Sequence, residues 1–468
     1  MKNLLVLGLV VLSGVFNVQA KDIEIESDSN IQFPPQGDLI SVEDLQNDVA
    51  ELKTLLSTVH PEPSFTMNVA EVEIQLDKLT QEIVEPMTQL EAWQYFSLMN
   101  PFFNDGHMLI SYPEYNQRLN DHIDNGGRLF PLQVGIDESQ NIYVTGIENL
   151  DEDIEVGDKI AAINGIAASE IVGNILNRMH GDTASNRRAF AAERFAKMYW
   201  LLYGDTGYYQ VDIDDSGDLK RYSIIGSNNR TESENSEIGD FVQRKILAND
   251  IGYLRIDRFY YSPDHEEPFF NFMEESWLEF HNANVQDVII DVRNNPGGTD
   301  HYWQLGIAPY VADESFLFLS GFKIRMTERN IRLGPFKGEL GAIVEGSYDD
   351  LVVVEEENDL RIPGKAYLLM GPLSYSSSVL FLTAFQDSDQ ALIAGESSGA
   401  RSCTTGRIHS FSFDGSQLEL TMPTAIFTRP AGQDLCKKPI QPDILISDEP
   451  SDPDIAVKRL ADAILDRR

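Results

Sequence analysis

The spacing of apolar residues predicts helices near the beginning of the chain. Between Ser41 and Pro61, apolar residues recur at intervals of three or four positions and would line one face of a helix. Ser41 and Asp44 resemble a capping box at its start, and Pro61 prevents the helix from continuing. Similar spacing predicts two further helices, over residues 72–84 and 87–99. Together these stretches predict a small helical domain.

A different pattern begins near residue 130. Apolar and polar residues alternate over residues 132–136 and 142–144, which is typical of half-buried strands. The pairs Gly157-Asp158 and Asn164-Gly165 flank a short apolar stretch and predict tight turns around another strand. Residues 227–240 are polar and indicate a linker or an exposed loop.

The last half of the chain alternates strand and helix signals. Short apolar runs at residues 251–256, 288–292, 366–370 and 391–394 predict buried strands, and residues 376–387 predict a helix. Strands and helices in this order are typical of βαβ units, so we expect a largely parallel sheet and the α/β fold class.

The net charge and the N-terminal segment indicate which partners the protein can bind and in which compartment it acts. Among the 468 residues, Asp and Glu exceed Lys and Arg by 39, so the surface should repel nucleic acid. Lys2, an apolar stretch over residues 4–16 and Val18-Gln19-Ala20 are typical of a signal peptide with its cleavage site. We expect a mature protein that is periplasmic or secreted and not inserted in the membrane.

Cysteine and histidine usage limits the possible sites. Cys403 and Cys436 are the two cysteines, and in an oxidising compartment they would form a disulfide. Two separate buried thiols are the alternative. The eight histidines are scattered without ligand spacing, and no phosphate-binding glycine-rich loop occurs, so neither a metal nor a cofactor is expected.

The strongest candidate for chemistry is a serine cluster between an apolar strand and an apolar helix. Ser376 lies at this junction, followed by Ser377 and Ser378. Backbone N–H groups at the start of a helix lack intrahelical partners and can stabilise an oxyanion. The alternative is that these serines only cap the helix.

Two other segments carry candidate residues. One of them is a glycine turn that ends a buried strand and can approach a ligand closely, with the sequence Asp291-Val292-Arg293-Asn294-Asn295-Pro296-Gly297-Gly298. It is alternatively an ordinary turn in which Asp291 and Arg293 form a structural ion pair. Upstream, Asn104-Asp105-Gly106-His107 supplies a histidine, the usual base for activating a serine.

These segments resemble the C-terminal processing peptidase family, which includes the tail-specific and tricorn-like enzymes. The segment ending in Gly297-Gly298 is similar to the family's Asp-Leu-Arg-x-Asn-x-Gly-Gly turn, and Ser374-Tyr375-Ser376 is similar to its nucleophile segment. Gly395-Glu396-Ser397-Ser398-Gly399 and Pro442-Asp443-Ile444 match later motifs in the family's order. The resemblance covers most of residues 100–446.

The resemblance implies a ClpP/crotonase-like catalytic core with a PDZ-like module beside the N-terminal helical domain. The turns at Gly157-Asp158 and Asn164-Gly165 are similar to those of the PDZ-like domain. The expected divisions of the chain are a signal peptide (1–20), a leader (21–40), the N-terminal helical domain (41–115), the PDZ-like module with a helical connection (116–226) and the catalytic α/β core (241–468).

One departure from the family pattern bears on the choice of base. The best-known branch has a lysine twenty-five residues after the serine, and Arg401 stands at that position. A guanidinium group stays protonated and cannot accept the serine proton. Asp105-Gly106-His107 resembles the Asp-Gly-His of the tricorn-like branch, which assigns His107 as the base, with His301 as the fallback.

The remaining roles also follow from the resemblance. The backbone N–H of Ser377, together with that of Gly298 or Gly297, would form the oxyanion hole. The tricorn-like branch has a supporting glutamate at the position of Cys436, and Asp434 is the nearest acidic residue to take that role. A Cys403–Cys436 disulfide would hold the Arg401 loop against the C-terminal segment.

We therefore expect an exported serine peptidase that hydrolyses peptide or protein substrates through an acyl-enzyme on Ser376, with His107 as general base. Two alternatives remain open. The chain is either a catalytically inactive binding protein of the same fold, or a non-peptidase serine esterase that uses the same serine and histidine.

Overall fold

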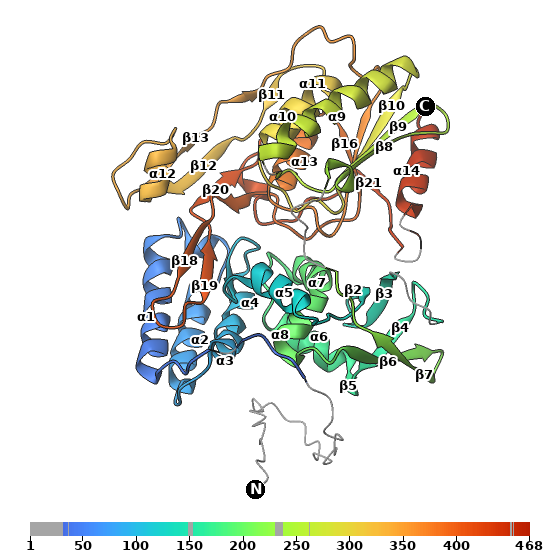
Figure 1. Cartoon of the computed structure of the whole chain (residues 1–468). Coiled ribbons are helices and arrows are strands. Elements are labelled where there is room, and N and C mark those ends of the chain that lie inside the picture. Colours follow the sequence, from blue (N-terminus) through green and yellow to red (C-terminus); the bar gives the residue numbers. More distant parts are fainter. Residues whose placement is uncertain are drawn as a thin grey trace.

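The computed structural model describes residues 31–35, 37–147, 153–229, 237–261, 263–449, 452 and 454–468. The expected signal peptide, most of the leader and residues 230–236 of the expected linker lie outside these residues. In the described part, every helix is too short or too polar to cross a membrane. Figure 1 shows two layers of structure, an upper α/β part and a lower part made of helices and a separate sheet.

The first predicted helix is confirmed. Helix α1 (Val42–Thr58) begins after Ser41, whose side chain accepts a hydrogen bond from the backbone N–H of Asp44 at 3.1 Å. The apolar face expected from the sequence is buried. The helices that follow are α2 (Val69–Glu82), α3 (Gln89–Phe96), α4 (Asn100–Phe103) and α5 (Tyr115–Asp124), with the 3₁₀ turns η1 (Pro63–Phe65) and η2 (Ser97–Met99).

The lower part also contains an antiparallel sheet in the order β2-β3-β4-β6-β7. The sequence predicts its first three strands but not β6 and β7. Gly157 and Gly165 have φ of 100° and 79°, which the tight turns require. The elements are β2 (Leu132–Ile136), β3 (Ile142–Ile147), β4 (Lys159–Ile163), β5 (Ile166–Ala167), β6 (Tyr208–Asp215), β7 (Asp218–Ile225), α6 (Ala168–Leu176), α7 (Ala184–Glu193) and α8 (Phe195–Tyr203). The domain boundaries stay a prediction.

The upper part is built on a six-stranded sheet in the order β21-β16-β15-β10-β9-β8. All neighbours are parallel except β8 and β9, so the predicted parallel sheet is confirmed. Its strands are β8 (Val242–Leu247), β9 (Ile251–Ile256), β10 (Asp287–Asp291), β15 (Ala366–Met370), β16 (Leu392–Gly395) and β21 (Ile444–Leu445). The helices of this part are α9 (Pro263–Asn282), α10 (His301–Gly306), α11 (Ala308–Val311), α12 (Glu328–Leu333), α13 (Ser377–Asp387) and α14 (Ile455–Leu465), with η3 (Ile238–Asp240) and η4 (Gln433–Leu435).

Both faces of this sheet are buried. Ile290 and Leu368 point into the main core, which includes α9 and α13, whereas Ile289 and Leu369 pack against α14. The alternation explains why these strands read as continuous apolar runs, as expected for a covered parallel sheet.

Smaller sheets join distant parts of the chain. Strand β1 (Leu109–Ser111) pairs with β19 (Glu419–Met422), which also pairs with the preceding strand β18 (His409–Ser412). In Figure 1 this β18–β19 hairpin extends from the upper part to the helices of the lower part. The other strands are β13 (Ile343–Ser347), β12 (Gly321–Arg325), β20 (Ala425–Thr428) and β17 (Thr404–Gly406), which form one sheet, and the pair β11 (Phe316–Leu317) and β14 (Leu351–Val352).

Candidate active site

Ser376 lies in the turn between β15 and α13. Its φ of 56° and ψ of −120° are unusual for a residue other than glycine. Although Ser376 directly precedes the helix, its side chain makes no capping hydrogen bond. Its Oγ instead lies 2.9 Å from Nε2 of His107. The capping interpretation therefore does not account for this hydroxyl group, which faces a potential base.

The hydrogen bonds of His107 define which ring nitrogen carries the proton. Nδ1 lies 3.0 Å from Oγ1 of Thr405, and that hydroxyl group donates to Oδ1 of Asp105 at 2.9 Å. Because the single hydroxyl proton of Thr405 points to the carboxylate, its oxygen accepts the proton of Nδ1–H. Nε2 then keeps its lone pair free for the proton of Ser376.

The segment around His107 is held by backbone contacts. The carboxylate of Asp105 accepts the backbone N–H of His107 at 2.8 Å, and β1, which follows directly, is paired with β19. A side chain at Gly106 would place its Cβ 2.4 Å from the ring of Tyr375. The Asp-Gly-His segment thus packs directly against the turn that carries Ser376.

The electrostatic surroundings favour a neutral His107. Burial lowers the pKa of His107 below its ordinary value, while the nearby carboxylates of Asp105 and Asp182 act in the opposite direction. Burial opposes the ionisation of Asp105, but the neighbouring His60 and His107 lower its pKa below the ordinary value. A neutral imidazole next to an ionised carboxylate is the state that a general base requires.

The glycine turn packs against the turn of Ser376. A Cβ on Gly297 would lie 2.7 Å from both Cβ of Ser376 and the backbone nitrogen of Ser377. The N–H of Gly297 is bonded to the side chain of Asn295 at 2.9 Å. Within the described residues, the N–H groups of Gly298 and Ser377 make no hydrogen bond. This leaves Gly298, rather than Gly297, as the partner of Ser377 in a possible oxyanion hole.

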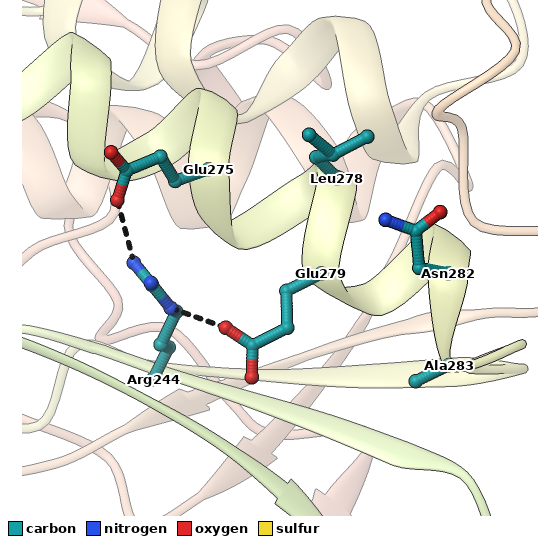
Figure 2. A pocket seen from close by; sticks show the side chains of 6 residues that line it. All are labelled: Arg244, Glu275, Leu278, Glu279, Asn282 and Ala283. Atoms are coloured by element: carbon teal, nitrogen blue, oxygen red, sulfur yellow. Dashed lines mark hydrogen bonds and ion pairs between the residues drawn. The ribbon is translucent and has the colours of Figure 1, made fainter.

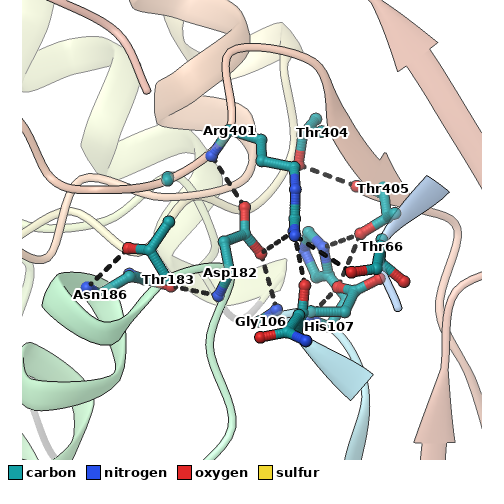
Figure 3. Close-up of polar contacts among 12 residues, drawn as sticks. Thr66, Gly106, His107, Asp182, Thr183, Asn186, Arg401, Thr404 and Thr405 are labelled. Carbon is teal, nitrogen blue, oxygen red and sulfur yellow. Dashed lines mark hydrogen bonds and ion pairs between the residues drawn. The ribbon is translucent and has the colours of Figure 1, made fainter. Parts of the chain in front are cut away.

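Arg401 has a different role from that of a base. Its guanidinium group donates to the backbone carbonyl groups of Asn104 and Thr66, and it lies 3.6 Å from Oδ1 of Asp182. The carboxylate of Asp182 also accepts the N–H groups of Gly106 and Arg401, both at 2.9 Å. Figure 3 shows this network beside His107. Arg401 and Asp182 therefore hold the loops that carry the site.

Two other sequence predictions concerned residues that the structure places elsewhere. Asp434 is exposed in η4, and none of the described hydrogen bonds joins it to His107, whose Nδ1 is occupied by Thr405. The supporting role of Asp434 stays a prediction, and the groups that the structure places beside Nδ1 of His107 are Thr405 and, through its hydroxyl group, Asp105. The fallback base His301 lies 3.5 Å from Glu266, and its described contacts do not include Ser376.

Three further expectations can be compared with the structure. Cys403 and Cys436 form a disulfide, so the alternative of two separate thiols does not apply. Asp291 and Arg293 form an ion pair at 2.8 Å, as in the alternative in which these two residues have a structural role. No group of three or more His, Cys, Asp or Glu that could hold a metal occurs among the described residues.

Sequence reasoning missed Thr405 and Asp182. Neither lies in a recognisable motif, because a hydroxyl or carboxyl group that orients a histidine is defined by its position in space. The neighbouring threonine, Thr404, points its hydroxyl group at the backbone carbonyl of Thr405 instead. The sequence therefore offers no signal that would select one threonine over the other.

A surface hollow of about 520 Å³ lies away from these residues. It is lined by Arg244, Glu275, Leu278, Glu279, Asn282 and Ala283. As Figure 2 shows, Arg244 forms ion pairs with Glu275 and Glu279 across it. The lining lacks serine, histidine and cysteine, so the arrangement around Ser376 remains the stronger candidate for chemistry.

Residues 250–446 match the family model described as Peptidase family S41. The chain contains a peptidase family S41 domain. The match supports a serine-type peptidase and confirms the predicted family for this domain. The S41 domain includes Ser376 and Gly298, whereas His107 lies outside the matched residues. The branch of the family is therefore not decided by this match.

Solved structures share the fold of the S41 peptidase chain. Mature CPAF complexed with lactacystin has a TM-score of 0.65 at 13% identity, and the likeness covers 90% of this chain and 97% of that chain. Mature CPAF alone has a TM-score of 0.64 at 14% identity, with 90% and 96% covered. These two structures confirm the α/β fold class of the family. No curated protein matches the chain.

Proposed function

We propose that the chain is an exported S41 peptidase that hydrolyses peptide bonds through an acyl-enzyme on Ser376, with His107 as general base. The observation that carries the proposal is the continuous hydrogen-bonded series from Ser376 through His107 and Thr405 to Asp105. It leaves the lone pair of Nε2 directed at the nucleophile.

In the proposed first step, Nε2 of His107 takes the proton of Ser376 while Oγ attacks the carbonyl carbon of the peptide. The negative charge moves to the carbonyl oxygen, where the N–H groups of Gly298 and Ser377 would receive it. The imidazolium is stabilised by the carboxylates of Asp105, through the hydroxyl group of Thr405, and of Asp182.

Breakdown of this tetrahedral intermediate releases the amine, which takes the proton from His107, and leaves an ester on Ser376. A water molecule then gives a proton to His107 and attacks the ester carbonyl. Collapse of the second intermediate returns that proton to Ser376 and releases the carboxylic acid. Every proton transfer passes through Nε2, so the series requires no lysine at the position of Arg401.

Export is supported by the N-terminal sequence and by the disulfide. Lys2 and the apolar stretch over residues 4–16 are typical of a signal peptide. The Cys403–Cys436 bond is expected to persist in the periplasm or outside the cell, where thiols are oxidised. The net charge of −39 makes nucleic acid an unsuitable partner. The match to a peptidase family supports peptides or proteins as substrates.

The proposal is tested with unfolded casein and with a matched pair of substrates, a peptide amide and the corresponding ester. We expect wild type to cleave casein and the amide, and Ser376→Ala to cleave neither. His107→Ala should be strongly impaired, whereas His301→Ala should retain activity because that ring faces Glu266. Cleavage of the ester alone would indicate an esterase, and no cleavage of any substrate by folded protein would indicate a binding protein.

A further inference from the structure

The side chain of Ser377 makes contacts that the proposed reaction does not use. Its Oγ donates a hydrogen bond to Oδ1 of Asp300 at 2.5 Å and lies 3.2 Å from Nε1 of Trp303, which donates to it. The indole of Trp303 is fully buried, and the side chain of Ser377 is 2% exposed. The hydroxyl group is thus enclosed between a carboxyl group and an indole.

These contacts join the two segments that supply the oxyanion donors. Asp300 follows Gly298 by two residues and precedes α10, which carries Trp303. Ser377 is the first residue of α13 and directly follows the nucleophile. The hydrogen bond between Asp300 and Ser377 therefore links the glycine turn to the start of α13.

Helix capping alone does not explain this arrangement. The next residue, Ser378, is fully buried on the same helix, and its hydroxyl group has no hydrogen-bond partner in the described part of the chain. Enclosing a carboxyl group opposes its ionisation, and burial raises the pKa of Asp300 to about 6. The hydrogen bonds that Asp300 accepts from Ser377 and Trp303 act in the opposite direction and favour the ionised carboxylate.

We propose that Asp300 is a positioning residue of the oxyanion hole, which holds the backbone N–H of Ser377 at a fixed distance from that of Gly298 by binding the hydroxyl group of Ser377. The inference rests on the proposed function of Ser376. Oxyanion donors act only when they lie about 2.7–3.1 Å from the oxygen on which the charge develops. A small displacement of one donor therefore weakens the stabilisation of the transition state. The binding of the substrate before the reaction depends much less on the position of this donor.

The test measures the inactivation of the full chain by a fluorophosphonate, whose phosphoryl oxygen occupies the oxyanion hole. The rate constant of inactivation and the binding constant of the reagent are determined separately. Ser377→Ala keeps the backbone donor and removes the hydroxyl group. We expect it to lower the inactivation rate constant about 10-fold, which is less than the 10²–10³ seen when a donor is removed, and to leave the binding constant unchanged.

Two substitutions of Asp300 separate a positioning role from a structural one. Asp300→Asn retains an oxygen that can accept from Ser377 and should stay within about 3-fold of wild type, whereas Asp300→Ala should resemble Ser377→Ala. The double variant Ser377→Ala/Asp300→Ala should be no slower than the slower single variant, because each substitution already removes the hydrogen bond between Ser377 and Asp300. Thermal unfolding shows that each variant is folded, and if Asp300→Ala does not fold, Ser377→Ala and Asp300→Asn suffice.

The matched control is Ser378→Ala, which removes the neighbouring buried hydroxyl group and should stay within about 2-fold of wild type. Inactivation of Ser377→Ala at the wild-type rate would overturn the inference and leave the proposed function intact. A loss confined to the binding constant, or equal losses in Ser377→Ala and Ser378→Ala, would also overturn it. By contrast, unlabelled wild type or labelled Ser376→Ala would contradict the proposed function itself.

Discussion

At the residue scale, one hydroxyl group sets the protonation pattern of the proposed base. Thr405 donates to Asp105 and accepts from Nδ1 of His107, so the carboxylate acts on the imidazole through a neutral relay. In a direct histidine–carboxylate pair, the negatively charged carboxylate would itself accept the hydrogen bond from Nδ1–H. The relay keeps the orientation of the ring and transmits part of the stabilisation to the imidazolium.

Thr405→Val tests this relay. Valine has nearly the same shape but cannot accept from Nδ1–H, so the ring loses its orienting bond and Asp105 loses a donor. We expect fluorophosphonate labelling to slow roughly 10- to 100-fold, in line with the contribution of a positioned base. Thr404→Val is the control, because its hydroxyl group bonds only a backbone carbonyl in the described structure. Equal effects of the two substitutions would contradict the relay.

The pH dependence of labelling follows from the state of His107. The base form is neutral, so the rate rises as pH increases through the pKa of His107, which burial lowers below 6.5. Labelling should therefore have its midpoint below pH 6.5. Asp105→Asn removes an anion that raises this pKa, so the midpoint should move to lower pH. A midpoint above 6.5, or a shift to higher pH in the variant, would contradict this description.

The sequence predicted Ser376 and His107 because each lies in a motif, but it did not predict Thr405. Asp434 was chosen as the acidic residue nearest to Cys436, which stands at the position of the family's glutamate, and the structure leaves Asp434 exposed in η4. Third partners of a histidine come from whichever segment the fold brings close, so spacing in sequence does not identify them.

At the element scale, the site depends on the contact between the glycine turn and the turn before α13. Gly297 has a φ of 101° and no room for a Cβ beside Ser376 and Ser377. The Pro-Gly-Gly sequence is therefore more than an ordinary turn. It lets one backbone segment approach another closely enough to aim N–H groups at a shared point.

Gly297→Ala should abolish labelling and destabilise the protein. The left-handed φ alone costs about 1–2 kcal/mol, and overpacking adds about 1–3 kcal/mol. Gly217→Ala is the matched control, because Gly217 has the same φ of 101° but nothing within 4 Å of its added Cβ. Chemical denaturation and labelling measure both variants. The packing argument fails if the two substitutions have equal effects on stability and on labelling.

Element prediction succeeded where the signal is local. The strand over residues 251–256 and the helix ending at Asp387 were predicted with nearly the observed bounds, because most of their residues are apolar. The second helix begins three residues before the predicted residue 72, since Asn68 caps it by accepting the N–H of Glu71. Strands β1, β17 and β19 are three or four residues long and pair with distant segments, which no local pattern indicates.

At the scale of the whole molecule, the proposed base and nucleophile come from different parts of the fold. His107 precedes β1 in the lower part, and Ser376 follows β15 in the upper part. The β1–β19 pairing and the Arg401–Asp182 network hold the two parts together at the site. The site is therefore complete only when the long-range pairings are formed.

The disulfide contributes to this assembly. Cys403 stands two residues before Thr405, and it is bonded to Cys436 across a separation of 33 residues. Removing it in Cys403→Ala/Cys436→Ala should lower the free energy of unfolding by about 3–4 kcal/mol, as the loop length predicts. Labelling should also slow, because β17 carries Thr405. Denaturant unfolding measures the first effect, and unchanged stability together with unchanged labelling would contradict this role.

The central claim is that Ser376 and His107 act as one unit across the two parts of the molecule. It is tested most directly by fluorophosphonate labelling of wild type, Ser376→Ala and His107→Ala under identical conditions. We expect rapid labelling of wild type, none of Ser376→Ala and a loss of labelling in His107→Ala, although all three are folded. Strong labelling of Ser376→Ala, or labelling of His107→Ala at the wild-type rate, would contradict it.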